Sequence, residues 1–187
     1  NTDGPGFIAA LQEAGVKGWE HCLVLGAGGA GRSVVLALAQ NGARDITILD
    51  TDEARAGRLA EYVTHNTSAR AQGKLAGPDN WSQAAARVDL IVNCTPVGMY
   101  PQVEASPAAS MDGVAEGAVV CDIVYNPLET KFLAMARQKG LLTVNGLSMF
   151  VYQGALTLKI LLGIDPPVDY MKEVVKHGLE LQRSNPD

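Results

Sequence analysis

Three glycines at fixed spacing are the residues of this chain that most directly indicate chemistry. Gly26, Gly28 and Gly31 form the pattern G-x-G-x-x-G within GAGGAG. In a dinucleotide site the first glycine permits a tight turn, the second admits a pyrophosphate, and the third lets a helix pack closely on a strand. Free N–H groups at the helix start bind the phosphates. The pattern predicts a dinucleotide site formed by Gly26, Ala27, Gly28, Gly29, Ala30 and Gly31, with a ligand-free glycine turn as the alternative.

A carboxylate follows at Asp50, 19 residues beyond Gly31. At this distance an acidic residue accepts hydrogen bonds from the adenosine ribose hydroxyls and repels a 2′-phosphate, so we expect NAD to be preferred over NADP. Arg55 leaves NADP open, because its guanidinium could turn toward a phosphate, although its spacing also suits the solvent face of a helix. The alternative for Asp50 is that it only caps the next helix.

These residues need a sheet edge to position them, and the pattern of apolar segments predicts one. Strands are expected at 21–25, 46–50, 88–95, 118–125 and 142–144, with a weak strand at 74–75 inside a loop-like stretch over 69–80. Helices are expected at 4–15, 30–40, 52–63, 128–139, 148–162 and 169–183. The alternation predicts an α/β fold, a doubly wound parallel Rossmann-like sheet with C-terminal helices.

Composition narrows the possible partners and the compartment. The 187 residues carry a net charge of −5, which argues against nucleic acid or an anionic membrane as a partner. Cys22, Cys94 and Cys121 lie in or beside apolar runs without metal-ligand spacing, so we expect buried free thiols, no metal site and a cytosolic, cytoplasmic protein. No apolar run approaches the ~18 residues of a membrane span.

Four stretches, in their order and spacing, resemble the shikimate dehydrogenase family, including its quinate/shikimate dehydrogenase branch. They are NTDGPGF at 1–7, GAGGAGR at 26–32, NCTPVGM at 93–99, and DIVYNPLETKFL to NGLSMFVYQGA within 122–155. The resemblance implies hydride transfer between a nicotinamide cofactor and shikimate (3-dehydroshikimate) or quinate (3-dehydroquinate). It also implies that an N-terminal substrate domain is absent from this chain, and that residues 1–7 are the junction between the two domains.

The resemblance assigns residues to the substrate. Asp3 matches the carboxylate of a catalytic Lys–Asp pair whose lysine lies in the absent domain, and such a pair can move a proton at the oxygen where hydride transfer occurs. The alternative is that Asp3 caps the first helix. Gln153 matches a glutamine that binds the substrate hydroxyls, Tyr125 a tyrosine near the substrate, and Asn1 helps to shape the substrate edge. An ordinary helix contact for Gln153 and a core position for Tyr125 are the alternatives.

The resemblance also extends the cofactor site. It places the loop after the fourth strand along the cofactor and two later residues near the nicotinamide, namely Thr95, Pro96, Val97, Met99, Gly146 and Met149. Met149 as core filler is the alternative. Members that use NADP carry an Asn-Arg-Thr-like triplet after the second strand, whereas this chain has Asp50-Thr51-Asp52, so Thr51 stands where the phosphate-binding arginine would be. This departure also favours NAD.

The predicted organisation is a dinucleotide-binding domain at 1–147 with a leading linker helix, followed by a helical segment at 148–187 that would pack on the absent substrate domain. The chain alone is expected to be inactive. Because the helical stretch ALTLKILL at 155–162 is apolar around much of its circumference, we expect self-association as a homodimer, unless this helix packs only on its own sheet. Two other functions stay open: a non-catalytic nucleotide-binding or quinate-sensing module, and a dehydrogenase of unrelated substrates.

Overall fold

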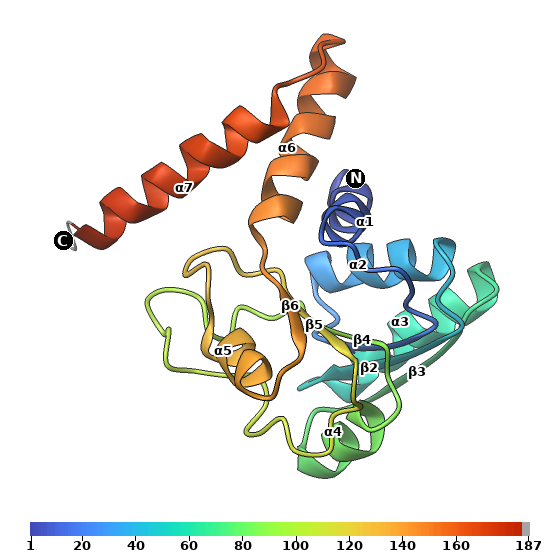
Figure 1. Cartoon of the computed structure of the whole chain (residues 1–187). Helices are drawn as coiled ribbons and strands as arrows, with labels where there is room; N and C mark the ends of the chain where they lie inside the picture. Colours follow the sequence, from blue (N-terminus) through green and yellow to red (C-terminus); the bar gives the residue numbers. More distant parts are fainter. Residues whose placement is uncertain (185–187) are drawn as a thin grey trace.

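A single six-stranded parallel sheet organises the computed structural model, which describes residues 1–184 (Figure 1). The strands lie in the order β3-β2-β1-β4-β5-β6. They are β1 (His21–Leu25), β2 (Asp45–Asp50), β3 (Arg70–Leu75), β4 (Leu90–Asn93), β5 (Val119–Asp122) and β6 (Leu142–Val144). The helices are α1 (Asp3–Glu13), α2 (Gly29–Gln40), α3 (Glu53–Asn66), α4 (Pro78–Ala85), α5 (Lys131–Gln138), α6 (Leu147–Leu162) and α7 (Val168–Ser184). The predicted doubly wound parallel sheet is confirmed.

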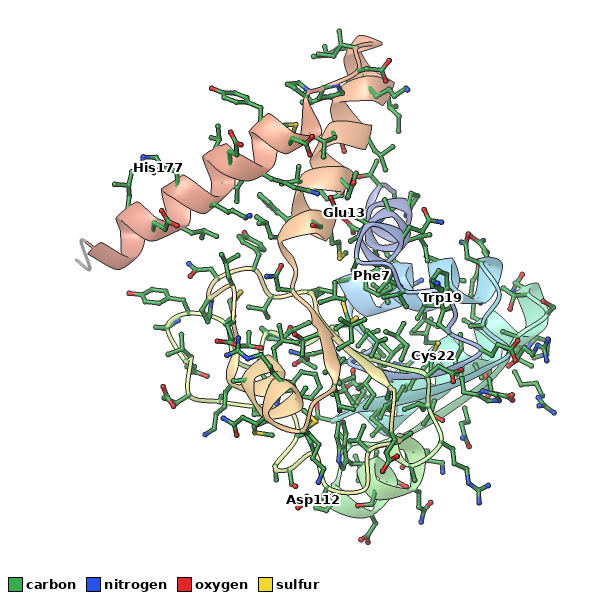
Figure 2. The ribbon with its side chains drawn as sticks, viewed as in Figure 1. Phe7, Glu13, Trp19, Cys22, Asp112 and His177 are labelled. Atoms are coloured by element: carbon green, nitrogen blue, oxygen red, sulfur yellow. The ribbon has the colours of Figure 1, made fainter. Side chains whose placement is uncertain are left out.

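Both faces of the sheet are buried, which explains the apolar runs of its central strands. Along β1, Val24 packs into the core beneath α1, α2 and α3, whereas Leu23 and Leu25 face the core beneath α4 and α5. Phe7 of α1 and Cys22 belong to the first of these cores (Figure 2). All three cysteines are free and buried, as the sequence predicted.

Residues 69–80 differ most from the prediction, because they form strand β3 and the start of helix α4 where a loop with a weak strand was expected. β3 is an edge strand that pairs only with β2, so its sequence RAQGKL is largely polar and gives little apolar signal. Gly73 lets α3 cross it closely, since a Cβ there would lie 2.2 Å from the carbonyl carbon of Ala56. α4 is short and begins with Pro78, a favoured first helical residue.

The first helix and the last two helices form a group above the sheet (Figure 1). α1 packs against α2 and α6, and a Cβ on Gly6 would lie 2.8 Å from the backbone nitrogen of Gln153. α7 folds back across α6 and is held by Lys172, which pairs with Glu13 and lies 4.6 Å from the centre of the Tyr152 ring. Beyond this contact α7 projects away from the body, and His177 lies on the projecting part (Figure 2).

The end of α6 and the outer part of α7 expose apolar side chains. Leu147, Met149, Val151 and Ala155 in the first part of α6 are buried, so that part packs on the chain's own core. The exposed large apolar side chains of this region are Ile160, Leu161, Leu162, Ile164, Tyr170, Val174 and Leu181, with Ile160 exposed by 73%. Self-packing therefore accounts for only the first half of the helix. Within residues 1–184, no helix combines the length and apolar character that crossing a membrane requires.

Candidate dinucleotide site

Each glycine of the GAGGAG turn meets a different geometric requirement in the structure. Gly26 has φ +97, in the left-handed region, and a Cβ on it would lie 2.9 Å from Cγ2 of Thr95. A Cβ on Gly31 would lie 2.0 Å from the carbonyl oxygen of Gly26, so α2 presses directly on the turn. Gly28 faces open space and occupies the N-cap of α2, whose first N–H groups receive no side-chain cap. The turn thus presents bare backbone donors at a helix start, as phosphate binding requires.

A cavity of about 730 Å³ opens beside this turn. It lies at the carboxyl ends of β1 and β4, where the strand order reverses and where ligands bind in doubly wound sheets. Of the predicted cofactor residues, the cavity wall contains Gly26, Gly28, Asp50, Thr51, Arg55, Thr95, Pro96 and Val97. The other predicted cofactor residues are not in its wall: Ala27, Gly29, Ala30, Gly31, Met99, Gly146 and Met149.

Gly146 and Met149 lie outside the cavity wall and are explained by packing within the chain. A Cβ on Gly146 would lie 2.1 Å from the carbonyl oxygen of Ile123, so this glycine permits close packing of two loops. Met149 is buried in the core with α1 and α2. Met99 is an exposed residue of the loop after β4. Contact of these residues with a cofactor stays a prediction.

Asp50 and Arg55 form a bidentate ion pair at the floor of the cavity. Arg55 donates from Nη2 to Oδ1 of Asp50 at 2.6 Å and from Nε to Oδ2 at 3.2 Å. The backbone N–H groups of Ala27 and Asp52 donate to the same carboxylate at 2.6 and 2.8 Å. Burial opposes the charge, but these hydrogen bonds, led by that of Arg55, outweigh it and lower the pKa of Asp50 to about 2.

The pair keeps the Asp50 carboxylate ionised at neutral pH and holds the Arg55 guanidinium beside it. Asp50 is almost completely buried, whereas the side chain of Arg55 is 46% exposed. Asp52, and not Asp50, caps α3, because its side chain accepts the N–H of Arg55 at 3.0 Å. The capping alternative for Asp50 is therefore wrong, and its carboxylate instead joins the end of β2 to the glycine turn.

Two wall segments of the cavity were not predicted. One is the start of α4, with Gly77, Pro78, Trp81 and Ser82, and the other runs from Pro107 to Asp112. Trp81 packs edge-on against Phe132 at a centroid distance of 6.3 Å. Asp112, near α4 in Figure 2, pairs with Lys139. Pro78, three residues before Trp81, is the one sequence signal for the start of α4. The 107–112 loop carries no periodic pattern.

The predicted substrate residues gather around the contact between α1 and α6. Asp3 is the first residue of α1, is half-buried, and makes no capping bond, while the oxygen of the Asn1 side chain accepts its N–H at 2.7 Å. Thr2 and Thr157 join the helices through their hydroxyls at 3.0 Å. Gln153 lies one turn before Thr157 on α6. The capping alternative for Asp3 is not supported by this geometry.

The same region reaches toward the cofactor cavity. The Asn1 amide donates to the hydroxyl of Ser33 at 3.1 Å, and Ser33 donates to the carbonyl of Gly29 in the glycine turn. Tyr125 stacks on Phe150 of α6 with ring centroids 4.3 Å apart. Among residues 1–184, no three His, Cys, Asp or Glu side chains are grouped so that they could hold a metal ion.

Comparison with known proteins places this geometry in a family. The model of the shikimate 5'-dehydrogenase C-terminal domain matches residues 146–176, and that of the saccharopine dehydrogenase NADP binding domain matches residues 22–103. The shikimate dehydrogenase (NADP(+)) of Syntrophomonas wolfei is 48% identical over 187 residues, which is all of this chain and 64% of that protein.

Two solved structures show the same fold. Shikimate 5-dehydrogenase from Listeria monocytogenes, in complex with shikimate and NAD, gives a TM-score of 0.87 at 32% identity over 93% of this chain and 62% of that one. Quinate dehydrogenase from Corynebacterium glutamicum, in complex with NAD, gives a TM-score of 0.85 at 30% identity over 95% of this chain and 62% of that one. The chain therefore spans less than two thirds of the length of the relatives it matches.

The fold and the glycine turn define a Rossmann-type NAD(P)-binding domain. The chain belongs to the shikimate dehydrogenase family, of which it is the C-terminal, nucleotide-binding portion.

Proposed function

We propose that this chain is the cofactor-binding part of a dehydrogenase that interconverts shikimate and 3-dehydroshikimate, or quinate and 3-dehydroquinate. One observation carries the proposal: the start of α1, with Asp3, lies against α6 beside Gln153 and is joined through Asn1 and Ser33 to the glycine turn. Asp3 and Gln153 thereby belong to one group of contacts between α1 and α6 that Asn1 connects to the glycine turn, while the Gln153 amide donates to the carbonyl of Phe150 at 2.9 Å.

The nicotinamide cofactor, when bound, accepts or supplies the hydride. The residues of the chain hold the reactants and move the proton. The backbone N–H groups at the start of α2 bind the pyrophosphate, and Asp50 accepts the ribose hydroxyls. Gln153 binds substrate hydroxyls, with Tyr125 and Asn1 shaping the pocket. Asp3 acts with a lysine outside the chain. Lys131, which lies within a matching stretch, donates instead to the carbonyl of Glu104 at 3.0 Å.

We further propose that NAD is preferred over NADP. The pKa of Asp50, about 2, keeps its carboxylate charged at neutral pH, where it repels a 2′-phosphate. Thr51 supplies no cation. Two of the five N–H donors of Arg55 bind Asp50, so the carboxylate already offsets much of the charge that Arg55 would offer to a phosphate. NADP in the name of the Syntrophomonas wolfei relative and NAD in the two complexes leave both cofactors within the range of the family.

The proposed organisation is a cofactor domain at 1–147 and a helical segment at 148–187 that packs on a substrate-binding part outside this chain. The exposed apolar residues at the end of α6 and on α7 support it, because soluble surfaces seldom leave such side chains together unless a partner covers them. Without that part, the same surface drives association of two copies. A quinate-sensing module without chemistry would keep the cofactor cavity and lack a lysine beside Asp3.

The test is calorimetric titration of the purified chain with NAD and with NADP, combined with turnover assays on shikimate and quinate. Trp81 lines the cavity, so its fluorescence in a Trp19→Phe variant reports binding independently. Binding of NAD without turnover supports a cofactor part that needs its other portion. Turnover by the chain alone would refute the role given to an outside lysine, and absence of binding to either dinucleotide would refute the proposal.

Turnover by the complete protein separates the dehydrogenase from the sensing module. The dehydrogenase converts shikimate or quinate when NAD is present, whereas the module binds without converting either.

A further inference from the structure

Two buried polar residues end the neighbouring strands β4 and β5. Asn93 and Asp122 are register partners in the parallel ladder, and both side chains are completely inaccessible to solvent. The Asn93 amide donates to Oδ1 of Asp122 at 3.0 Å. Buried polar side chains are costly unless they are hydrogen-bonded. A fully hydrogen-bonded pair at the carboxyl ends of two strands therefore suggests a specific structural role.

Asn93 holds the loop at 95–99, which the resemblance places along the cofactor. Its Oδ1 accepts both the backbone N–H of Thr95 at 3.0 Å and the Thr95 hydroxyl at 2.6 Å. Its amide nitrogen donates to the carbonyl of Val97 at 3.3 Å. Thr95 and Val97 both line the cofactor cavity, whereas Asn93 does not.

Asp122 holds the loop at 123–130, which contains Tyr125. Its Oδ1 also accepts the backbone N–H of Val124 at 3.0 Å, and its Oδ2 accepts the hydroxyl of Thr130 at 2.7 Å. Thr130 in turn caps α5, since its oxygen accepts the N–H of Leu133. A Cβ on Gly98 would lie 3.6 Å from Cβ of Thr130, so the two loops also pack on one another.

We propose that Asn93, Asp122 and Thr130 are positioning residues that set the cofactor loop at 95–99 and the substrate loop at 123–130 relative to each other. The naming of the two loops rests on the proposed function. Asn93 acts on the cofactor loop, Thr130 on the substrate loop, and Asp122 joins them. None of the three needs to touch a ligand: each acts through the backbone that it holds.

The three positions make different predictions in the complete protein that contains this chain. Asn93→Ala should weaken NAD binding about 10-fold, the size expected when a coupled network is broken. Thr130→Val keeps the side-chain shape, so NAD affinity should stay within about 2-fold while kcat falls about 10-fold, and Thr130→Ser should restore it. Asp122→Asn should lower both NAD affinity and kcat, because it presents an N–H to a ring of donors.

Val120→Ala is the matched control, because Val120 is a fully buried residue of the same strand without a polar contact in the network. It should lower the melting temperature but leave NAD affinity and kcat near their original values. Equal losses of affinity and kcat in Val120→Ala and Asp122→Asn, at equal loss of stability, would overturn the proposal.

Amide hydrogen exchange on the cofactor-free protein tests the network apart from the proposed function. Asp122→Asn should speed exchange at both 95–99 and 123–130, and Val120→Ala should not single out these loops. Unchanged exchange in both loops of Asp122→Asn refutes the network even if the protein is a dehydrogenase. Faster exchange with no NAD binding by the unaltered protein supports the network and refutes the proposed function.

Discussion

The glycine turn allows stability and cofactor binding to be separated by two substitutions three residues apart. In Gly31→Ala the new Cβ would lie 2.0 Å from the carbonyl oxygen of Gly26 and 2.9 Å from its carbon. The obstacle is backbone, and that backbone is itself fixed by the hydrogen bond from the N–H of Gly26 to the carbonyl of Leu49 at 2.7 Å. Relief therefore requires α2 to move away from β1.

The expected loss of unfolding free energy for Gly31→Ala is about 3 kcal/mol, at the upper end for overpacking. For a chain of this length it corresponds to a fall in melting temperature of roughly 10 °C. Gly28→Ala meets no atom within 4 Å and has φ −73, which alanine adopts readily. Its cost should not exceed about 1 kcal/mol, the difference between glycine and alanine at an N-cap.

For NAD binding we expect the opposite: Gly28→Ala, which costs little stability, should cause a large loss of affinity. The methyl group of Gly28→Ala would stand where a pyrophosphate approaches the backbone, and the loss of one or more charge-assisted hydrogen bonds weakens NAD binding at least about 10-fold. Thermal unfolding and titration of Trp81 fluorescence measure the two effects separately. Gly28→Ala with unaltered NAD affinity would refute the placement of the pyrophosphate, and Gly31→Ala with an unaltered melting temperature would refute the packing argument.

Three further perturbations test other features. Thr51→Arg adds a cation beside the cavity and should tighten NADP binding by about 10-fold in calorimetry, the value of one charged hydrogen bond; no gain would contradict the reason given for NAD preference. Burial raises the pKa of Asp122 to about 6, so protonated Asp122 contributes stability that is present below about pH 4 and is lost as pH rises through 6. The loss amounts to about 3 kcal/mol of unfolding free energy. Asp122→Asn should flatten this pH dependence in denaturant titrations. Leu161→Glu places a charge on the exposed end of α6 and should reduce self-association in light scattering, whereas an unchanged size distribution would show that this surface is not the contact.

Most of the fold could be predicted because its central strands are buried on both faces. The short apolar runs of β1 and β2 are typical of strands covered on both faces, and the glycine turn marks where the first crossover begins. β3 escaped prediction because an edge strand needs only one partner and tolerates polar residues such as Arg70 and Gln72. β4 and β5 were predicted too long, because Asn93 and Asp122 bind the backbone that follows and turn it away.

The wall of the cavity could be predicted only where binding a dinucleotide requires a particular residue type at a particular spacing. Gly26, Gly28 and Asp50 were identified from spacing, and they share one wall of the cavity. Trp81 and the 107–112 loop could not be identified, since an apolar wall requires volume and no specific residue. The bond between Arg55 and Asp50 was also beyond prediction, because spacing on a helix places Arg55 equally well toward solvent.

The path of the chain through the sheet has a consequence for the order of assembly. The chain builds outward from β1 to β3, returns to the centre of the sheet, and builds outward again from β4 to β6. Every strand pairing except that of β1 with β4 therefore joins strands that are consecutive in the sequence. Only the pairing of β1 with β4 closes a long loop, which makes it the slowest contact to form by diffusion. A dinucleotide bound across these two strand ends would bridge the two halves of the sheet, and would therefore oppose their separation.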